Sequence, residues 1–569
     1  MINLGIIGCG PRGLAALECL FSEIANYEPI DLKIQVFDPA DELGAGAVWN
    51  SNQSEANWIN ITLRGLSNLK GRESIKINKL TIPSFPKFTR WLEQDTGEVI
   101  SNQKDSFLLR SKMGEYLKQR FDSISEVLVE HNILTIINKK IIDLHIVDGQ
   151  ITAIDSDEKA YYINECLITV GHQETEFDDQ MKSWVDYTKS NSEISLFTSP
   201  YDAKIAESSL TNSNVAIRGL GLSTIDVIRE LALQSSGSFS KSENAPFLVF
   251  NKTNACKYKI IPFSLDGLIA APKPLTMVID RQFQPSSSEL TTFRESLIQE
   301  LSDPSNISSI NFLLTCFASS FVNKFQVKYN YSSDILEDLV TSWIIDPNTK
   351  HASILDTELE LKEYLKALIL MAIGSKKPSL DYCIGQYWKW LQPTMYEILS
   401  HANLGDKIMK KIISLDDQTK RYSYGPPVDS SLQLLALSES GILDLSLVNN
   451  PKIELSNKGW VLSNGKTQIT CDIMINSVLP SPAAQRISDG PIKSLVDSAD
   501  IDVVSSDLGV STSFDGQIMF NSDKIKGVSI LGRNAKGSVL GVDAILECFG
   551  PRIQDWAIGA VNRIRNLQS

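Results

Sequence analysis

The sequence predicts an α/β fold in which two glycine-turn βαβ units are combined with a helical region. Residues 8–13 and 219–224 each place a glycine-rich turn between a short apolar segment and a helical pattern. The stretch 288–418 lacks such turns and has apolar residues at helical spacing. A chain of 569 residues has room for two or three such domains.

The first βαβ unit begins at the N-terminal end of the sequence. A short apolar strand at 4–7 leads into the turn Gly8-Cys9-Gly10-Pro11-Arg12-Gly13. A helical pattern and a second strand at 32–37 follow, and that strand ends at Asp38, 25 residues after Gly13. Each glycine has a physical role, because the first permits the tight turn, the second lets the backbone approach a diphosphate, and the third lets the helix lie against the strand. The acid can accept hydrogen bonds from a ribose, so this order predicts dinucleotide binding. The alternative is a glycine-rich turn without a ligand.

The second unit starts about 210 residues later. A strand at 214–218 is followed by the turn Gly219-Leu220-Gly221-Leu222-Ser223-Thr224. Thr224 takes the place of the third glycine, which predicts a wider turn or a looser contact between helix and strand. The candidate second strand, 247–250, ends in Asn251-Lys252 and not in an acid. An amide and a cation leave room for a 2′-phosphate, which favours NADPH over NADH, although Lys252 can also be an ordinary surface lysine.

Two such units describe a flavoprotein with a Rossmann-like FAD domain and an inserted NADPH domain. The segments 165–172, a short strand ending in Gly-His, and 471–480 fit the segments that return the chain after each unit, and 527–532 fits a strand that precedes a flavin-proximal helix. The predicted division gives residues 1–205 and 440–569 to FAD binding and residues 206–287 and 419–439 to NAD(P)H binding. Residues 288–418 then form a helical insertion, which serves either as a structural cap or as a lid and substrate pocket.

Five helices are expected in the helical insertion, at 288–301, 307–321, 335–345, 358–373 and 383–399. Pro393 is expected to break or kink the last of them, because proline lacks the backbone N–H that the helix needs. In the second unit, Asp226 stands in the first helical turn. It is either an acid near the ligand or a carboxylate favoured by the helix dipole.

Composition excludes several classes of protein. Apolar residues make up 43% and charged residues 21%, which is typical of a globular chain and not of a disordered or fibrous one. The formal net charge of -14 argues against nucleic acid or an anionic membrane as partner. The eight cysteines form no CxxC pair, the five histidines are scattered without a metal-binding pattern, and no metal is expected. With no signal pattern at the start and no apolar run long enough to span a bilayer, we expect a cytoplasmic protein with reduced thiols.

Several motifs together resemble a bacterial family of large FAD/NAD(P)-binding proteins. The resemblance is carried by the segments IIGCGPRGLAALECL at 6–20, VFDPADELGAGAVWN at 36–50, TVGH at 169–172, SPYD at 199–202, IRGLGLSTIDVIREL at 217–231, PFSLDGL at 262–268, APKPL at 271–275, YGPPVDSSLQLLAL at 424–437 and LGRNAKGSVLGVDAILECFG at 531–550. The characterised branch that these segments resemble is that of the aspartate N-monooxygenases (nitrosuccinate synthases), relatives of the ornithine and lysine N-hydroxylases. The helical middle carries the least of the resemblance.

The resemblance implies a reaction cycle. NADPH reduces FAD, the reduced flavin reacts with O2 to give a C4a-hydroperoxyflavin, and a neutral substrate amine attacks the distal oxygen. The amine of a small amino acid becomes a hydroxylamine, and repetition converts aspartate to nitrosuccinate. Alternatives are an FAD/NAD(P)H dehydrogenase or oxidase and a nucleotide-binding sensor without turnover. The oligomeric state stays open.

A dicarboxylate substrate requires fixed cations, and arginine suits carboxylates best. Candidate carboxylate ligands are Arg64, Lys273, Arg281, Arg421 and Arg533. The residues expected at FAD are Gly8, Gly10, Pro11, Arg12, Gly13, Asp38, Trp49, Asn60, His172 and Arg533. Those expected at NADPH are Gly219, Gly221, Leu222, Ser223, Thr224 and Lys252. Within these sets, Trp49 and Asn60 are expected to contact the flavin, Arg12 a phosphate or a neighbouring carboxylate, and His172 is either flavin-proximal or structural.

Overall fold

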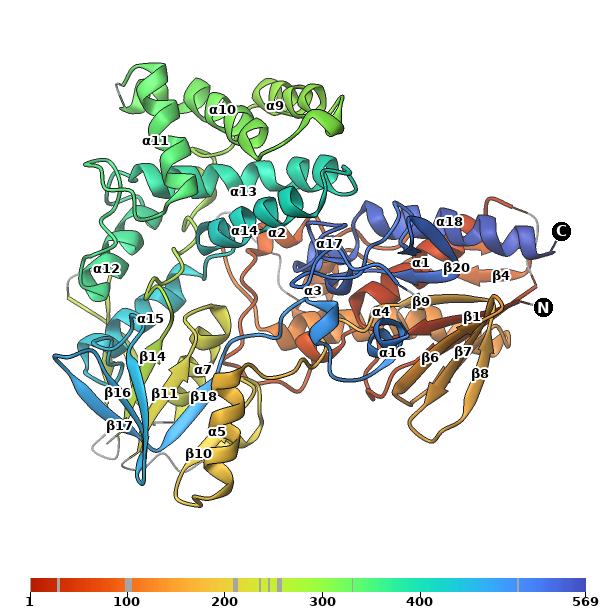
Figure 1. Ribbon diagram of the computed structural model, residues 1–569, viewed down its shortest axis with the longest axis horizontal. Coiled ribbons are helices and arrows are strands. Elements are labelled where there is room, and N and C mark those ends of the chain that lie inside the picture. Colours follow the sequence, from red (N-terminus) through yellow and green to blue (C-terminus); the bar gives the residue numbers. More distant parts are fainter. Residues whose placement is uncertain are drawn as a thin grey trace.

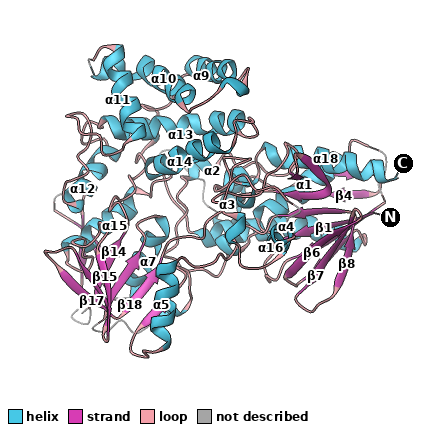
Figure 2. Cartoon of the chain, in the orientation of Figure 1, coloured by secondary structure: helices cyan, strands magenta, loops and turns pink. Residues whose placement is uncertain are grey.

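A computed structural model describes residues 2–27, 31–97, 105–207, 213–234, 237–243, 246–252, 258–329, 331–498 and 501–568. It has three lobes: a first sheet with both chain ends, a second sheet, and a group of helices (Figure 1). Strands lie in two separate places with helices around and between them (Figure 2). The predicted α/β class with two parallel sheets and a helical subdomain is confirmed.

The first sheet has six strands, in the order β19-β20-β9-β1-β2-β5. All neighbours are parallel except β19 and β20. The strands are β1 (Ile2–Ile7), β2 (Leu32–Phe37), β5 (Leu134–Ile137), β9 (Glu165–Ile168), β19 (Gln517–Phe520) and β20 (Asp523–Ile530). The residues of β1 and β9 are nearly all buried, as expected for a parallel strand covered on both faces.

Helices and small sheets cover the first sheet. The helices of this lobe are α1 (Pro11–Ile24), α2 (Leu63–Leu66), α3 (Phe88–Thr96), α4 (Arg110–Glu130), α16 (Pro491–Asp497), α17 (Ile545–Cys548) and α18 (Pro551–Gln568). The small sheets are β3 (Ile75–Ile77) with β4 (Leu80–Ile82), and β6 (Ile141–Val147) with β7 (Gln150–Asp155) and β8 (Ala160–Ile163). One core packs α1, α4 and α18 on one face of the sheet, and a second core packs β6, β7, β8 and α16 on the other.

The second sheet is fully parallel, in the order β10-β18-β11-β14. Its strands are β10 (Ser195–Phe197), β11 (Asn214–Arg218), β14 (Lys259–Phe263) and β18 (Ile473–Asn476). Around it lie α5 (Asp179–Lys189), α6 (Lys204–Glu207), α7 (Leu222–Gln234), α15 (Val428–Glu439), the hairpin β12 (Ser238–Lys241) and β13 (Leu248–Asn251), and the three-stranded β15 (Lys452–Ser456), β16 (Gly459–Ser463) and β17 (Gln468–Cys471).

The pairing of β10 and β18 bears on the domain boundaries. Both strands pair within the second sheet, although the predicted division gives their residues to the FAD-binding domain. We propose that the nicotinamide-binding unit also includes the segments that carry these two strands. The division itself remains a prediction.

The helical lobe contains α8 (Met277–Asp280), α9 (Ser287–Glu300), α10 (Asn311–Tyr329), α11 (Ser333–Ile345), α12 (Leu361–Ala372), α13 (Leu380–Leu399) and α14 (Asp406–Ser423). α13 continues through Pro393, so the helix does not break at this residue, and a kink there stays a prediction. α14 was not expected, and it extends past the predicted end of the insertion at 418.

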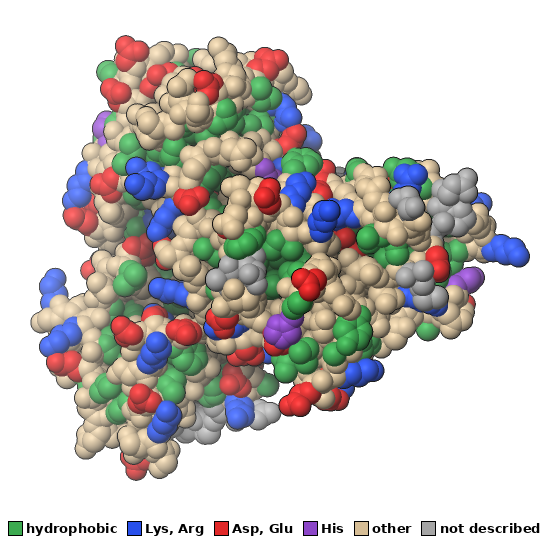
Figure 3. Space-filling view, turned by 45° about the vertical axis from the view of Figure 1, so that its right-hand side comes forward, with side chains coloured by type: hydrophobic (Ala, Val, Ile, Leu, Met, Phe, Trp, Pro, Cys, Tyr) green, Lys and Arg blue, Asp and Glu red, His purple; other side chains and the backbone are tan. Residues whose placement is uncertain are grey.

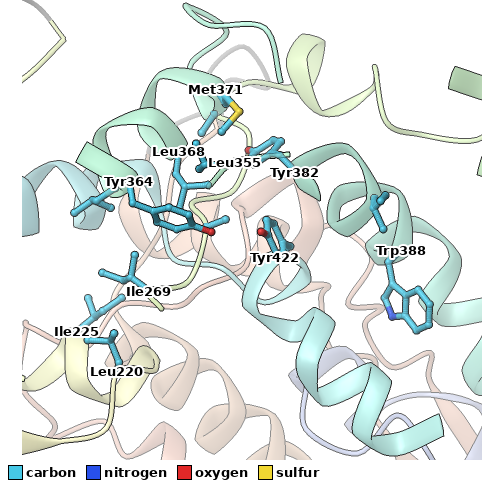
Figure 4. Close-up of a cluster of buried hydrophobic side chains, with 14 of the residues drawn as sticks. Leu220, Ile225, Ile269, Leu355, Tyr364, Leu368, Met371, Tyr382, Trp388 and Tyr422 are labelled. Carbon is cyan, nitrogen blue, oxygen red and sulfur yellow. The ribbon is translucent and has the colours of Figure 1, made fainter. Parts of the chain in front are cut away.

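A single hydrophobic core joins the helical lobe to the second sheet. Figure 4 shows this continuity, with Leu220 and Ile225 of the glycine-turn region at one end, Tyr364 and Tyr422 in the middle, and Trp388 of α13 at the other. Because these side chains are buried together, the helices and the second sheet form one packed unit.

Candidate functional site

A large cleft of about 3240 Å³ lies where the three lobes meet. The first lobe contributes residues between Ala47 and Asn68, and the second contributes the turn at 219–223 and residues 263–273. The helical lobe contributes α13, through Lys389, Trp390, Gln392, Pro393, Tyr396 and Glu397. The helical insertion therefore walls the cleft directly, which favours the substrate-pocket interpretation over a purely structural cap.

The first glycine turn is held by protein contacts on two sides. Gly8 has φ +85°, and a Cβ there would lie 2.8 Å from the Cα of Val170. A Cβ on Gly13 would lie 2.7 Å from the carbonyl oxygen of Gly8. Both glycines are therefore required by the turn itself, as the sequence predicts.

Gly10 is different, because the nearest atom to an added Cβ would be the Cα of Gly46 at 3.6 Å. The first glycine turn and the Gly44-Ala45-Gly46 loop thus face each other with no side chain between them. Helix α1 begins directly after Gly10, and no side chain caps its N-terminus. The two backbones approach to van der Waals contact there, and an uncapped helix N-terminus beside backbone without side chains suits the diphosphate of a dinucleotide, so the residues present fit FAD.

Asp38 and Arg12 make contacts that qualify their predicted roles. The carboxylate of Asp38 accepts hydrogen bonds from the backbone N–H groups of Cys9 (2.6 Å) and Ala40 (2.9 Å), so it braces the turn. A ribose contact for Asp38 stays a prediction. Arg12 donates to the carbonyl oxygen of Val542 at 2.9 Å, and it forms no ion pair with a carboxylate among the described residues.

Trp49 and Asn60 both line the cleft, and Pro11 starts helix α1. Helix α4 packs closely on the Trp49 backbone, because a Cβ on Gly114 would lie 1.9 Å from its carbonyl oxygen. The Asn60 amide donates to the carbonyl oxygen of Tyr424 at 3.3 Å. The loop between these residues is thereby fixed against both α4 and the end of α14, and the flavin contact of its side chains remains a prediction.

The second glycine turn opens into the cleft. Gly219, Leu220, Gly221, Leu222 and Ser223 all line it, and a Cβ on Gly221 would meet no atom within 4 Å. The hydroxyl of Thr224 is buried and has no hydrogen-bond partner in the described part of the chain. The start of α7 therefore presents open space beside backbone amides, which fits the diphosphate of a nicotinamide dinucleotide.

A strand forms close to the predicted segment 247–250, but it is not the second strand of the βαβ unit. β13 pairs antiparallel with β12, and the parallel neighbour of β11 is β14. The reason is that the β12–β13 hairpin is inserted before the chain returns to the sheet. The residue after β14 is Ser264, so Ser264 and not Asn251 takes the position of Asp38. Lys252 is exposed, donates to the Ser440 carbonyl oxygen at 3.1 Å, and is not among the residues that line the cleft.

A charged cluster lies where α2, α8 and α13 meet. Arg64 binds Asp105 through two nitrogens, each at 3.1 Å, and also Asp280 at 2.9 Å. Lys389 of α13 forms an ion pair with Asp280. Burial acts to raise the pKa of Asp280, but the two cations outweigh it, so the pKa is lowered and the carboxyl stays ionised. Arg64 thus mainly positions Asp280, and only its remaining nitrogen can reach a substrate.

Lys273 belongs to the same cluster but lacks a carboxylate partner. Its ammonium group donates to the carbonyl oxygen of Asn60, and it forms no ion pair among the described residues. Burial, followed by the nearby charge of Lys389, lowers the pKa of Lys273 to about 7. The cluster of Arg64, Lys389 and Lys273 therefore has three cationic side chains against the carboxylates of Asp105 and Asp280.

Two other predicted cations also line the cleft. Arg281 is exposed at the end of α8. The Nε of Arg421 is buried and has no hydrogen-bond partner within the described ranges, and its guanidinium lies 5.1 Å from the ring centre of Tyr422. A buried donor without a partner is costly, so this arginine is suited to bind an anion.

The C-terminal wall of the cleft is also charged. Asp543 accepts from Arg533 (2.7 Å) and from Lys420 (2.8 Å), and these cations hold the pKa of Asp543 well below its usual range although burial acts to raise it. His172 lines the same wall, and burial with the Arg533 charge lowers its pKa to about 4. His172 is therefore neutral at pH 7. Because Arg533 is already paired, it is a weaker candidate for binding substrate than Lys273 or Arg421.

Sequence reasoning missed the contribution of α13 and the role of Asp226. Lys389 is a lone cation in a helix rich in aromatic residues, and that contrast was the available signal. Asp226 forms a buried ion pair of 2.7 Å with Arg110 of α4 and accepts from the Tyr201 hydroxyl at 3.1 Å. It therefore joins the second unit to the first, which neither interpretation of Asp226 anticipated.

The face shown in Figure 3 carries acidic and basic side chains interspersed with apolar ones. Among the described residues, no helix combines the length and the apolar character that a membrane span requires.

Comparison with known proteins gives one family and one curated relative. Residues 5–173 match the family described as FAD-NAD(P)-binding. Nitrosuccinic acid synthase npaA of Aspergillus oryzae is 24% identical over 540 residues, which cover 86% of this chain and 80% of that protein.

Solved structures of similar arrangement include two amine hydroxylases. The ornithine N-hydroxylase of Kutzneria sp. 744 aligns with 100% of this chain and 99% of its own, at 11% identity and a TM-score of 0.47. The FAD-bound cadaverine monooxygenase DfoA of Erwinia amylovora aligns with 100% and 95%, at 10% identity and a TM-score of 0.49.

Proposed function

Residues 5–173 match the family described as FAD-NAD(P)-binding, and we propose that this protein is an FAD-dependent, NADPH-using N-monooxygenase that acts on the amine of a small amino acid. The observation that carries the proposal is the common cleft. The Trp49–Asn60 loop of the first unit and the glycine turn of the second unit open into one space, and the rest of its lining includes both cationic and acidic side chains.

The chain's own residues have defined tasks in this proposal. The backbone around Gly10 and Gly46 holds the FAD diphosphate, and the start of α7 at Gly221 holds that of NADPH. Trp49 and Asn60 flank the flavin, which when reduced activates O2 and supplies the oxygen atom. α13 walls part of the cleft, where it would help to exclude water.

We propose aspartate as the substrate and nitrosuccinate as the product of repeated oxidation. Two features support this choice: the similarity to nitrosuccinic acid synthase npaA, and the cations that lack carboxylate partners. Arg421 and, at the rim, Arg281 are the proposed ligands of the two substrate carboxylates, and Lys273 is a candidate for this role. In the first oxidation, R–NH2, O2, NADPH and H⁺ give R–NHOH, H2O and NADP⁺.

The proposal is tested with the purified yellow protein. Anaerobic NADPH should bleach the flavin, and in air aspartate should accelerate NADPH consumption with stoichiometric N-oxygenated product. Glutamate, ornithine and cadaverine serve as the comparison substrates. If every amine yields only hydrogen peroxide, the protein is an oxidase. If NADPH does not bleach the flavin, a nucleotide-binding sensor is the better description.

Substitution tests the substrate ligands. Arg421→Ala removes a guanidinium whose Nε has no partner among the described residues and should raise the KM for aspartate at least about tenfold, the equivalent of one charge-assisted hydrogen bond. The flavin content and the rate of bleaching by NADPH should be unchanged. A variant with an unaltered KM would show that this arginine does not bind the substrate.

A further inference from the structure

N-oxygenation requires the lone pair of the substrate nitrogen. An aliphatic amine is mostly protonated at pH 7, and an ammonium group has no lone pair. The site must therefore remove a proton from the substrate before the oxygen atom is transferred. None of the ligand roles assigned above provides a group for this proton.

Lys273 is placed to receive it. The side chain lies on the cleft wall beside Asn60, and its Nζ bonds only a backbone carbonyl oxygen. The charged groups that face it are the Lys389 ammonium, which opposes a charge on Lys273, and the Asp280 carboxylate, which favours one. Asp280 is already bound by Lys389 and by Arg64, and Arg64 is in turn bound to Asp105.

The two lysines of the cluster therefore differ in character. Burial lowers the pKa of Lys389 as well, but its ion pair with Asp280 opposes this and favours the ammonium form. Lys273 has no such partner among the described residues, and its nearest charged neighbour of the same sign is another lysine. A half-buried amine beside a like charge favours its neutral form, which is the form that can accept a proton.

Resting on the proposed function, we propose that Lys273 is the proton acceptor for the substrate ammonium group. The proton moves from R–NH3⁺ to the lone pair of the Lys273 Nζ, leaving R–NH2 in the cleft and an ammonium on the lysine. No electrons are exchanged in this step. The proton later leaves to water, so the lysine returns to its neutral form for the next turnover.

Burial and the Lys389 charge set the pKa of Lys273 near 7, so a large share of the side chain is neutral at physiological pH. A bound substrate carboxylate would raise this pKa by adding an opposite charge. Substrate binding and proton uptake by Lys273 therefore support each other: the anion that binds the cluster makes the lysine a stronger base for the ammonium.

The test compares two substrates that differ in the basicity of nitrogen. N-hydroxyaspartate is a much weaker base than aspartate and is mostly neutral at pH 7, so it needs no proton acceptor. Lys273→Met should lower kcat/KM for aspartate by about 100-fold or more, the range of general base catalysis, with less than about a threefold loss for N-hydroxyaspartate. Raising the pH should restore the aspartate reaction, because solvent then deprotonates the amine. Lys452→Met, on an exposed hairpin strand, is the control and should match the wild type.

The outcomes separate the two hypotheses. Equal losses for both substrates would overturn the proton-acceptor role and leave Lys273 as a carboxylate ligand. A wild-type protein that oxygenates no amine would overturn the proposed function and this inference together. Flavin content and anaerobic bleaching by NADPH should be normal in Lys273→Met, which excludes a folding defect.

A second measurement does not depend on activity. Competitive acetylation of the flavin-loaded protein across a pH series, read by mass spectrometry of the peptide with Lys273, reports the titration of this amine. We expect a midpoint near pH 7 for Lys273. A midpoint near the ordinary lysine value of about 10.4 would overturn the proposal.

Discussion

The two glycine turns share one backbone scheme and differ in what surrounds it. In the first turn the N–H of Gly8 donates to the carbonyl oxygen of Phe37 at the end of β2. In the second turn the N–H of Gly219 donates to the carbonyl oxygen of Phe263 at the end of β14, and both distances are 2.8 Å. At the second glycine of each turn, a Cβ on Gly10 would meet the Cα of Gly46 at 3.6 Å, whereas a Cβ on Gly221 would meet no atom within 4 Å. At the third position the first turn has Gly13, where a Cβ would lie 2.7 Å from the Gly8 carbonyl oxygen, and the second turn has Thr224. The first turn is therefore a folding element as well as the proposed FAD-binding element, and the second turn lines the cleft.

The helices after the turns differ in the same direction. α1 packs against α18 and is buried within its own lobe. α7 is tied to the first lobe by the Asp226–Arg110 pair and by Arg229, whose guanidinium lies 3.6 Å from the ring centre of Trp58. The second glycine turn thus depends on contacts with the first lobe to hold its place beside the proposed flavin site.

The largest effect is expected from breaking the pair between the units. Asp226→Ala leaves Arg110 buried without a charge partner and should lower the free energy of unfolding by about 3–5 kcal/mol, measured by urea denaturation. Asp334→Ala removes an exposed first-turn acid of α11 and should change stability by less than about 0.5 kcal/mol. If both variants are equally stable, the pair does not secure the second unit.

The next effect separates the turns directly. Gly13→Ala places a Cβ 2.7 Å from the Gly8 carbonyl oxygen and should destabilise the protein by about 1–3 kcal/mol, with loss of bound flavin. Thermal unfolding and the flavin-to-protein absorbance ratio measure both. A fully flavin-loaded variant of normal stability would contradict the close contact in this turn.

Gly221→Ala should affect binding and not stability. The added Cβ meets no protein atom within 4 Å but occupies the space proposed for the NADPH diphosphate. We expect an unchanged melting temperature and a rise of about tenfold in the Kd for NADPH, equivalent to about 1.4 kcal/mol. Isothermal titration measures the change in Kd, with NADP⁺ in place of NADPH. A lower melting temperature with normal binding would show that Gly221 serves folding and not nucleotide binding.

The smallest effects are expected at Lys252 and Asp266, which are tested for an influence on the choice between NADPH and NADH. Lys252→Ala should leave the KM for NADPH within about twofold, because Lys252 lies on the Ser440 carbonyl and outside the cleft lining. Asp266→Asn removes a carboxylate that lies two residues after Ser264 and lines the cleft. It should lower the ratio of the KM for NADPH to that for NADH by a few-fold, through reduced repulsion. A strong effect of Lys252→Ala alone would support the predicted assignment of residues 247–250 as the second strand of the second unit.

Local patterns predicted much of this protein. Strands 32–37 and 214–218, both glycine turns and most helices of the insertion follow from short-range periodicity and from the steric demands of glycine. The errors depend on contacts between residues far apart in the sequence. The β12–β13 hairpin precedes β14, so the first strand after α7 is not the partner of β11. Helix α13 continues through Pro393 within a packed core.

By itself, the sequence determined that the chain forms two glycine-turn units with a helical insertion, because those features are encoded in contiguous residues. Only the tertiary structure decided which cations remain without carboxylates. The sequence gives Arg64 and Lys273 equally as candidate carboxylate ligands. In the structure Arg64 forms ion pairs with Asp105 and Asp280, whereas Lys273 donates to a backbone carbonyl oxygen. Charge neutralisation depends on distances between side chains that are far apart along the chain, and folding alone sets those distances.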